Sequence, residues 1–327
     1  MMKIRAHYIV IIILLLTSCS NKVRVVLLPD TQTYAEKFPQ ILDSQLDWIA
    51  TNSKKIDFVL QQGDLTQNNN KTEWDLVKKA FSKIDERVPY ILAVGNHDMG
   101  SGPGKFADVR NSELFNQYFK YADFSSKKYF GGAFEKDKLD NSYYLINTGK
   151  IKWLVITLEF GPRNEVLDWA NYIAAKYPDR LTIVNTHAYM YNDNTRIGEG
   201  DKWRPQAYGV GKDSGPKAVN DGEQIWEKLI SKNPNIRWVF SGHILDSGVG
   251  TLISTNEKGL PVYQMLANFQ QGVEGSVNGG NGFLRIIDMD FKKKTATIKT
   301  YSPYLKIFKE EKEHSFIFND VNFSPAK

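Results

Sequence analysis

Five short apolar segments of this chain each run directly into polar residues, and this repeated pattern constrains the fold more than any other feature. The segments cover residues 23–28, 58–62, 90–94, 181–184 and 238–240. Near-continuous runs of β-branched and apolar residues are typical of strands that are buried on both faces. Residues 40–53 and 72–84, which lie between the early segments, place their apolar side chains on one helical face. This alternation of strand and helix predicts an α/β fold.

The polar residues that follow these strands predict where the functional site lies. In α/β folds, ligands bind beyond the carboxyl ends of the strands. Here those ends carry carboxylate, amide and imidazole groups: Asp30, Asp64, Asn96, His97, His187 and His243. Imidazole and carboxylate groups that gather at one edge are suited to bind transition metals. We therefore expect a metal site at this edge.

The composition excludes several other classes of protein. The chain has 327 residues, of which 42% are hydrophobic and 13% aromatic, and this balance excludes a disordered or fibrous protein. Its formal charge is +5, and the charges are spread along the sequence without a block of five or six like charges. A dedicated nucleic-acid binder normally has a concentrated basic stripe, so we predict no specific nucleic-acid partner.

The amino terminus has the pattern of an export signal. A short basic region precedes the nine apolar residues 8–16, which are too few for the roughly 20 residues that cross a bilayer as a helix. Leu16–Cys19 resembles the bacterial lipobox, in which the cysteine becomes the lipidated first residue of the mature protein. We expect residues 1–18 to be a lipoprotein signal peptide and 19–22 a lipidated tether. The protein would then be exported and lipid-anchored to a membrane of the bacterial cell envelope, on its periplasmic or cell-surface face. An ordinary cleaved signal with an incidental Cys19 is the alternative.

Four motifs of this chain resemble, in order and spacing, those of the calcineurin-like metallophosphoesterases. They are Gly63-Asp64, Gly95-Asn96-His97-Asp98, Thr186-His187 and Ser241-Gly242-His243. The resemblance covers residues 23–301, and its most specific part is Gly-Asn-His-Asp after a strand. It implies a four-layer α-β-β-α sandwich of two mixed sheets flanked by helices, with a metal centre at the carboxyl ends of the strands. Residues 302–327 would be a C-terminal extension that packs on this domain.

The resemblance also implies a role for each polar residue. The metal ligands would be Asp30, Gln32, Asp64, Asn96, His187 and His243. Asp64 would bridge two divalent metals, with Asn96 and the two histidines completing one site and Asp30 and Gln32 serving the other. Two cations about 3.5–4 Å apart can activate water and clamp the attacking and leaving oxygens. His97 would not bind metal. Oriented by Asp98, it would face the phosphoryl group and stabilise or protonate the leaving oxygen.

The sequence departs from the usual family pattern at two positions, both at the same metal. Gln32 stands where a histidine is usual, and Leu245 replaces the second histidine of Gly-His-x-His. That site keeps oxygen ligands, which favour Mn²⁺, Mg²⁺ or Ca²⁺, and would be the weaker one. The other would hold Zn, Fe or Mn tightly. Asp246 is an alternative ligand, although strand geometry would point it elsewhere. A branch of the superfamily with Asp-Thr-Gln at residues 30–32 looks similar.

Three functional hypotheses follow. The first is a metal-dependent phosphoric ester hydrolase, with a phosphorylated small molecule or a phosphodiester as substrate and the membrane contacted through the lipid anchor only. The second is a catalytically weak or inactive metal-binding surface module that retains the fold. The third is a structural protein whose histidines only stabilise the core. His97 and Asp98 favour the first, because neither is needed to hold metal. The substrate-binding residues are not determined: Trp203, Arg204 and Tyr208 lie in the polar loop 189–222 and could either contact substrate or pack the loop.

Overall fold

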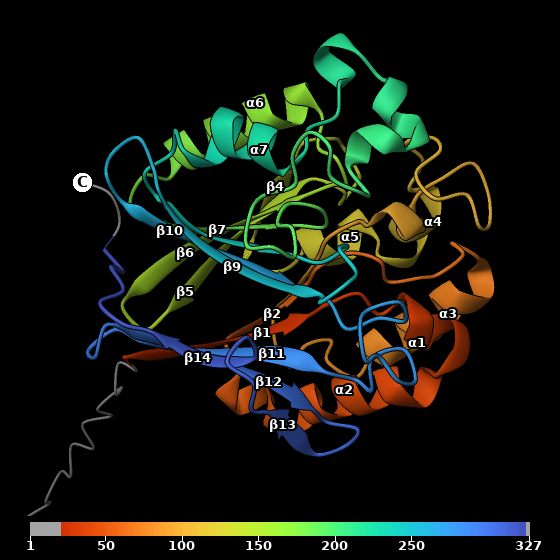
Figure 1. Ribbon diagram of the computed structural model, residues 1–327, viewed down its shortest axis with the longest axis horizontal. Helices are drawn as coiled ribbons and strands as arrows, with labels where there is room; N and C mark the ends of the chain where they lie inside the picture. Colours follow the sequence, from red (N-terminus) through yellow and green to blue (C-terminus); the bar gives the residue numbers. More distant parts are fainter. Residues whose placement is uncertain (1–20, 325–327) are drawn as a thin grey trace, which may run out of the picture.

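The computed structural model describes residues 21–324 and contains two β-sheets that pack face to face (Figure 1). Sheet A has the strand order β13 (Ile307–Lys309), β12 (Thr295–Ser302), β11 (Leu284–Asp290), β1 (Lys22–Leu28), β2 (Phe58–Gln61), β3 (Tyr90–Leu92), with β14 (Ser315–Phe318) also paired to β12. Sheet B has the order β4 (Phe130–Ala133), β5 (Ser142–Thr148), β6 (Ile151–Leu158), β7 (Leu181–Thr186), β8 (Ile236–Ser241), β10 (Pro261–Ala267), β9 (Val249–Thr255). Both sheets mix parallel and antiparallel pairs.

Helices cover the outer faces of both sheets (Figure 1). On the side of sheet A lie α1 (Gln32–Lys37), α2 (Pro39–Asn52) and α3 (Lys71–Phe81). On the side of sheet B lie α6 (Asn164–Lys176) and α7 (Gly222–Ile225), and α4 (Glu113–Tyr118) and α5 (Tyr121–Ser125) connect the two halves of the chain. The predicted four-layer α-β-β-α sandwich is therefore confirmed.

The two helices predicted from periodicity are present within one to three residues of their expected ends. In α3, the side chain of Asn70 caps the amino terminus by accepting a hydrogen bond from the backbone N–H of Glu73. Its buried face carries Trp74, Val77 and Phe81. Burial of this apolar stripe against sheet A and α2 fixes the helix in place, because an isolated helix of 11 residues is marginal in water.

The core lies mainly between the two sheets. Phe58 of β2 meets Trp153 of β6 across the interface, with ring centroids 6.0 Å apart. Close to the strand ends, hydrogen bonds join the sheets directly: the Asn185 amide donates to the carbonyl of Gln61 at 2.9 Å, and the Gln62 amide donates to the carbonyl of Ser241 at 2.8 Å. The carboxyl ends of strands from both sheets are thereby held next to one another.

The five strands that end in polar residues belong to two sheets. β1, β2 and β3 are in sheet A, whereas β7 and β8 are in sheet B. Strand periodicity alone predicted a single edge, and the second sheet entered the prediction only through the family resemblance. The residues from 302 onward contribute β13 and β14 to sheet A. Within residues 21–324, no helix is both long and apolar enough to cross a bilayer. The predicted signal peptide and Cys19 lie outside the described residues.

Candidate metal centre

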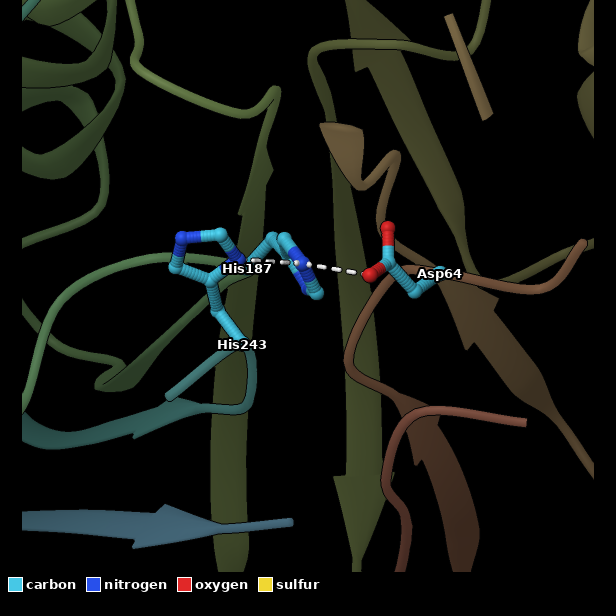
Figure 2. Close-up of side chains that lie close together, drawn as sticks. All are labelled: Asp64, His187 and His243. Carbon is cyan, nitrogen blue, oxygen red and sulfur yellow. Dashed lines mark hydrogen bonds and ion pairs between the residues drawn. The ribbon is translucent and has the colours of Figure 1, made fainter. Parts of the chain in front are cut away.

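Asp64, His187 and His243 form a buried cluster where the two sheets meet (Figure 2). Asp64 follows β2 of sheet A, and the two histidines follow β7 and β8 of sheet B. Their candidate ligand atoms all lie within 4.8 Å of one another. Nε2 of His187 is 3.1 Å from Oδ2 of Asp64, 3.1 Å from Oδ1 of Asn96 and 3.2 Å from Nδ1 of His243. Four of the six predicted ligands therefore converge on one point.

Glycines next to these ligands permit the close approach of the loops. A Cβ atom on Gly95 would lie 2.1 Å from Oδ1 of Asp64, and one on Gly242 would lie 2.0 Å from Oδ1 of Asp30. Neither position can carry any side chain without displacing a carboxylate. This steric requirement explains the glycine that precedes Asn96 in one motif and His243 in another.

The hydrogen bonds of the two histidines fix which nitrogen faces the cluster. Nδ1 of His187 lies 2.8 Å from the carbonyl of Gln62, and Nε2 of His243 lies 2.8 Å from the carbonyl of Trp203. A carbonyl only accepts, so each of these ring nitrogens carries the proton. The other two nitrogens then turn their lone pairs toward each other at 3.2 Å. Two facing lone pairs repel unless a proton or a metal cation lies between them, and two imidazole nitrogens that face one position in this way are suited to bind a metal.

The electrostatics of the cluster also favour a positive charge. Burial works against ionisation of His187, but the charges of Asp64 and Asp30 outweigh it and raise its pKa to about 9. Burial, together with the charge of His187, lowers the pKa of His243 to about 3. For Asp64, burial is outweighed by the charges of His187 and His97, so its pKa falls below the usual range. The site thus favours one positive charge beside an ionised carboxylate.

The other predicted ligands form an oxygen-rich site next to the histidines. Asp30 is buried, accepts hydrogen bonds from the backbone N–H of His243 at 3.2 and 3.1 Å, and has its pKa raised by burial to about 8. Gln32 donates to Oδ2 of Asp64 at 2.9 Å. Its own amide oxygen is buried without a hydrogen-bond partner. An orphaned buried acceptor next to the Asp64 carboxylate fits a ligand for a hard cation.

Gln270 is a candidate ligand that the sequence analysis missed. Its side chain is buried, and its amide donates to Oδ2 of Asp30 at 3.1 Å. The residue follows β10, so it occupies the same kind of strand-end position as the predicted ligands. Gln264, inside β10, interrupts the apolar run of this strand and hid the pattern.

Leu245 and Asp246 differ in their relation to the site. Leu245 lines the cleft beside His243, and a Cβ on Gly272 would lie 3.2 Å from its Cδ1. Asp246 is exposed and accepts a hydrogen bond from the amide of Asn192 at 3.0 Å. Its carboxylate is held away from the cluster, in agreement with the direction expected from strand geometry.

His97 borders the same cluster. Its Nδ1 lies 2.8 Å from the carbonyl of Gln67, so this nitrogen carries the proton and Nε2 remains free to exchange one with a ligand in the cleft. Its ring packs against Phe106, with centroids 4.0 Å apart. Its backbone N–H also donates to Oδ1 of Asp64 at 2.9 Å.

Asp98 does not orient the imidazole of His97, which corrects the predicted role. Its buried carboxylate accepts hydrogen bonds from the backbone N–H groups of Leu65, Thr66 and Gly95 at 3.1, 2.9 and 3.0 Å. It therefore binds the loop after β2 to the loop after β3. Burial raises its pKa to about 6. Asp98 is a positioning residue for the loops that carry Asp64 and His97.

A cleft of about 480 Å³ opens over the cluster. Two loops contribute side chains to this cleft. Phe106 comes from the loop after β3, and Trp203 and Tyr208 come from the loop after β7. Arg204 does not line the cleft, because its guanidinium pairs with Asp221 at 2.7 Å. Of the three loop residues considered as substrate contacts, two remain in position to make one.

The two-sheet sandwich and its Asp–His–His cluster define the class of protein, a metallophosphoesterase fold. The chain belongs to the calcineurin-like phosphoesterase family, whose model matches residues 23–247. The chain is also similar to the uncharacterized protein YvnB of Bacillus subtilis (strain 168), with 29% identity over 285 residues. That match covers 85% of this chain, which spans 20% of the length of the relative.

A solved structure shows the same architecture. The purple acid phosphatase PPD1 from yellow lupin (Lupinus luteus) seeds superposes with a TM-score of 0.55 at 16% identity, covering 91% of this chain and 54% of that one. The 5'-nucleotidase precursor from Thermus thermophilus gives a TM-score of 0.44 at 11% identity, covering 93% of this chain and 56% of that one. The likeness to the purple acid phosphatase supports the fold.

Proposed function

We propose that this protein is a metal-dependent phosphoric ester hydrolase. The observation that carries the proposal is the pair of imidazole nitrogens 3.2 Å apart beside Asp64, with Nε2 of His97 bordering the same cleft. A site that only held metal would need the first feature and not the second. A stabilised metal and a nearby proton donor are the two components that hydrolysis of a phosphoric ester requires.

The residues of the site form two groups of candidate metal ligands and one candidate proton donor. Asp64, Asn96, His187 and His243 would hold one cation, and Asp30, Gln32 and Gln270 would hold a second one next to Asp64. Bound divalent ions would supply an activated water and neutralise the phosphoryl charge. With both ring nitrogens protonated, His97 would keep its Nδ1 proton on the carbonyl of Gln67 and give its Nε2 proton to the leaving oxygen, which leaves a neutral imidazole.

The alternative is a metal-binding module without turnover. Release of phosphate or alcohol from generic monoester and diester substrates, measured with the purified protein and added Mn²⁺, separates the two functions. We expect turnover of at least one substrate class, which chelation abolishes. A protein that binds metal and hydrolyses none of these substrates would support the alternative.

The metal sites should differ in affinity. One has two imidazole ligands, whereas the other has only oxygen ligands because Gln32 and Leu245 stand in place of histidines. Imidazole raises the affinity for late divalent metals, so we expect close to one retained metal per chain and stimulation by added Mn²⁺ or Mg²⁺. Leu245→His should raise the retained metal toward two per chain. Elemental analysis after dialysis measures both, and two retained metals in the unmodified protein would contradict the asymmetry.

Gln270 should contribute to the weaker site. Gln270→Met keeps the approximate volume but removes the amide beside Asp30, so the Mn²⁺ concentration for half-maximal activation should rise by about 10- to 100-fold. The matched control is Gln271→Met, because Gln271 borders the same cleft but is exposed. Mn²⁺ titration of binding by calorimetry gives a readout that does not depend on activity. Equal behaviour of the two variants would remove Gln270 from the ligand set.

Anchoring through Cys19 remains a proposal that rests on the sequence Leu16–Cys19. Cys19→Ser should give a protein that incorporates no labelled fatty acid and fractionates with its signal peptide uncleaved or poorly cleaved. The measurement is metabolic labelling followed by fractionation. Unmodified protein that takes up no label would rule out lipidation.

A further inference from the structure

The amino end of sheet A carries a groove of about 600 Å³, at the opposite end of the sandwich from the metal centre. Cationic side chains line this groove and the adjoining turn between β11 and β12. We call this surface the basic end; its cationic residues are Lys22, Arg24, Lys54, Lys55, Lys292, Lys293, Lys294 and Lys299. Three acidic residues also line the groove: Asp57, Asp288 and Asp290.

The acidic residues are already engaged. Asp288 forms a two-pronged pair with Arg24 at 2.6 and 2.9 Å, and Asp57 accepts the backbone N–H of Arg24 at 2.8 Å. Asp290 accepts the backbone N–H groups of the β11–β12 turn at 3.1 and 2.9 Å and lies 3.7 Å from Nζ of Lys22. Within residues 21–324, Lys54, Lys55 and the three turn lysines at 292–294 make no ion pair. These five ammonium groups are exposed and can bind an anion from outside the protein.

The basic end accounts for the whole positive charge of the protein. Removal of residues 1–18, which contain Lys3, Arg5 and no acidic residue, lowers the formal charge from +5 to +3. The basic end has eight cationic and three acidic residues, an excess of five, so the rest of the mature chain is net negative by two. Charges that are scattered along the sequence are therefore gathered on one surface by the fold.

The position of this surface relative to the chain identifies the partner. Cys19 precedes Lys22 by three residues, which reach at most about 10 Å. Any lipid on Cys19 would place the bilayer surface against the basic end. β1 has seven residues and spans about 20 Å, and it separates Lys22 from Asp30 at the metal centre. Figure 1 shows β1 beside β11, and their register places Lys22, at the start of β1, opposite Asp290, at the end of β11.

We infer that the basic end binds the anionic headgroups of a lipid bilayer and holds the metal centre on the side that faces away from the membrane. Each lysine near an anionic surface strengthens binding by about fivefold. A lipid chain alone would leave the domain free to tumble on its tether, whereas the added charge contact fixes one orientation. The inference does not depend on the chemistry at the metal centre.

The test is vesicle flotation of the mature chain, residues 19–327, carrying Cys19→Ser so that no lipid contributes. Residues 21–324 bury a large core of their own, so we expect this chain to fold. At low salt it should float with phosphatidylcholine vesicles that contain phosphatidylglycerol and not with phosphatidylcholine alone. Salt should release it, because exposed charges are screened. The triple variant Lys54→Glu, Lys55→Glu, Lys293→Glu should lower the partition coefficient by at least about 100-fold.

The matched control reverses three exposed lysines outside the basic end: Lys128→Glu, Lys136→Glu and Lys212→Glu. It has the same net charge as the first triple variant and should keep most of the binding. Thermal unfolding verifies that both variants are folded. Equal loss in both variants, equal binding to neutral vesicles, or binding to heparin without binding to either vesicle would each overturn the inference.

Discussion

Replacement of His187 by alanine should remove the tightly bound metal and lower kcat by at least about 10⁴-fold, since residues that act as one unit lose their function together. Nε2 of His187 lies within 3.2 Å of candidate ligand atoms on Asp64, Asn96 and His243. The ring is closely packed, because a Cβ on Gly63 would lie 2.6 Å from its Nδ1, which itself lies 2.8 Å from the carbonyl of Gln62. Elemental analysis and turnover, measured on the same preparation, should fall in parallel.

The control is His314→Ala. His314 belongs to the C-terminal segment that packs near Phe269, outside the cluster, and burial lowers its pKa to about 4. Removing this imidazole should leave metal content and kcat within a few-fold of the unmodified protein. If His187→Ala keeps its metal, or if both variants lose it equally, the assignment of the cluster is wrong.

The second large effect is expected at His97. His97→Ala should lower kcat by about 10²- to 10⁴-fold and leave the metal content unchanged, because the ring acts only as charge develops on the leaving oxygen. The loss should depend on the substrate. An ester whose leaving group is already acidic, such as a nitrophenol, needs little protonation and should suffer much less than an alkyl ester.

This comparison of leaving groups separates a proton donor from a merely structural residue. Loss of packing against Phe106 would slow all substrates alike. Phe106→Leu, which removes the neighbouring ring but keeps the imidazole, serves as the matched variant and should show no dependence on the leaving group. A His97→Ala protein that is depleted of metal would place this histidine among the ligands.

The sequence located the candidate ligands that follow uninterrupted apolar strands and missed the contacts that depend on how loops fold back. Asp30, Asp64, His187 and His243 each come within three residues of a buried strand, so the pattern located them. Gln270 follows a strand with a polar residue inside it, and no periodicity marked it. Asp98 was assigned to the ring next to it in sequence, but backbone N–H groups of the neighbouring loops lie closer to its carboxylate.

The sequence did not reveal the basic end, because its residues are far apart along the chain. Its residues come from β1, from the turn that follows α2 and from the hairpin of β11 and β12, which lies more than 200 positions further along the chain. A count of charges along the sequence mixes these lysines with the acidic residues that lie elsewhere on the protein. The pairing of β1 with β11, which places Lys22 opposite Asp290, and with β2, which places Val25 opposite Phe58, brings them to one surface.

The candidate metal ligands come from two different sheets. The supply of metal should therefore affect how long the folded protein survives. An ion held by Asp64 on one side and by His187 and His243 on the other fastens together segments that are more than 100 residues apart. Because the unfolded chain offers no such arrangement, every bound ion stabilises the native state by mass action. Where metal is scarce, the sandwich would open more often along this seam, and proteases would remove the molecules that had not been loaded.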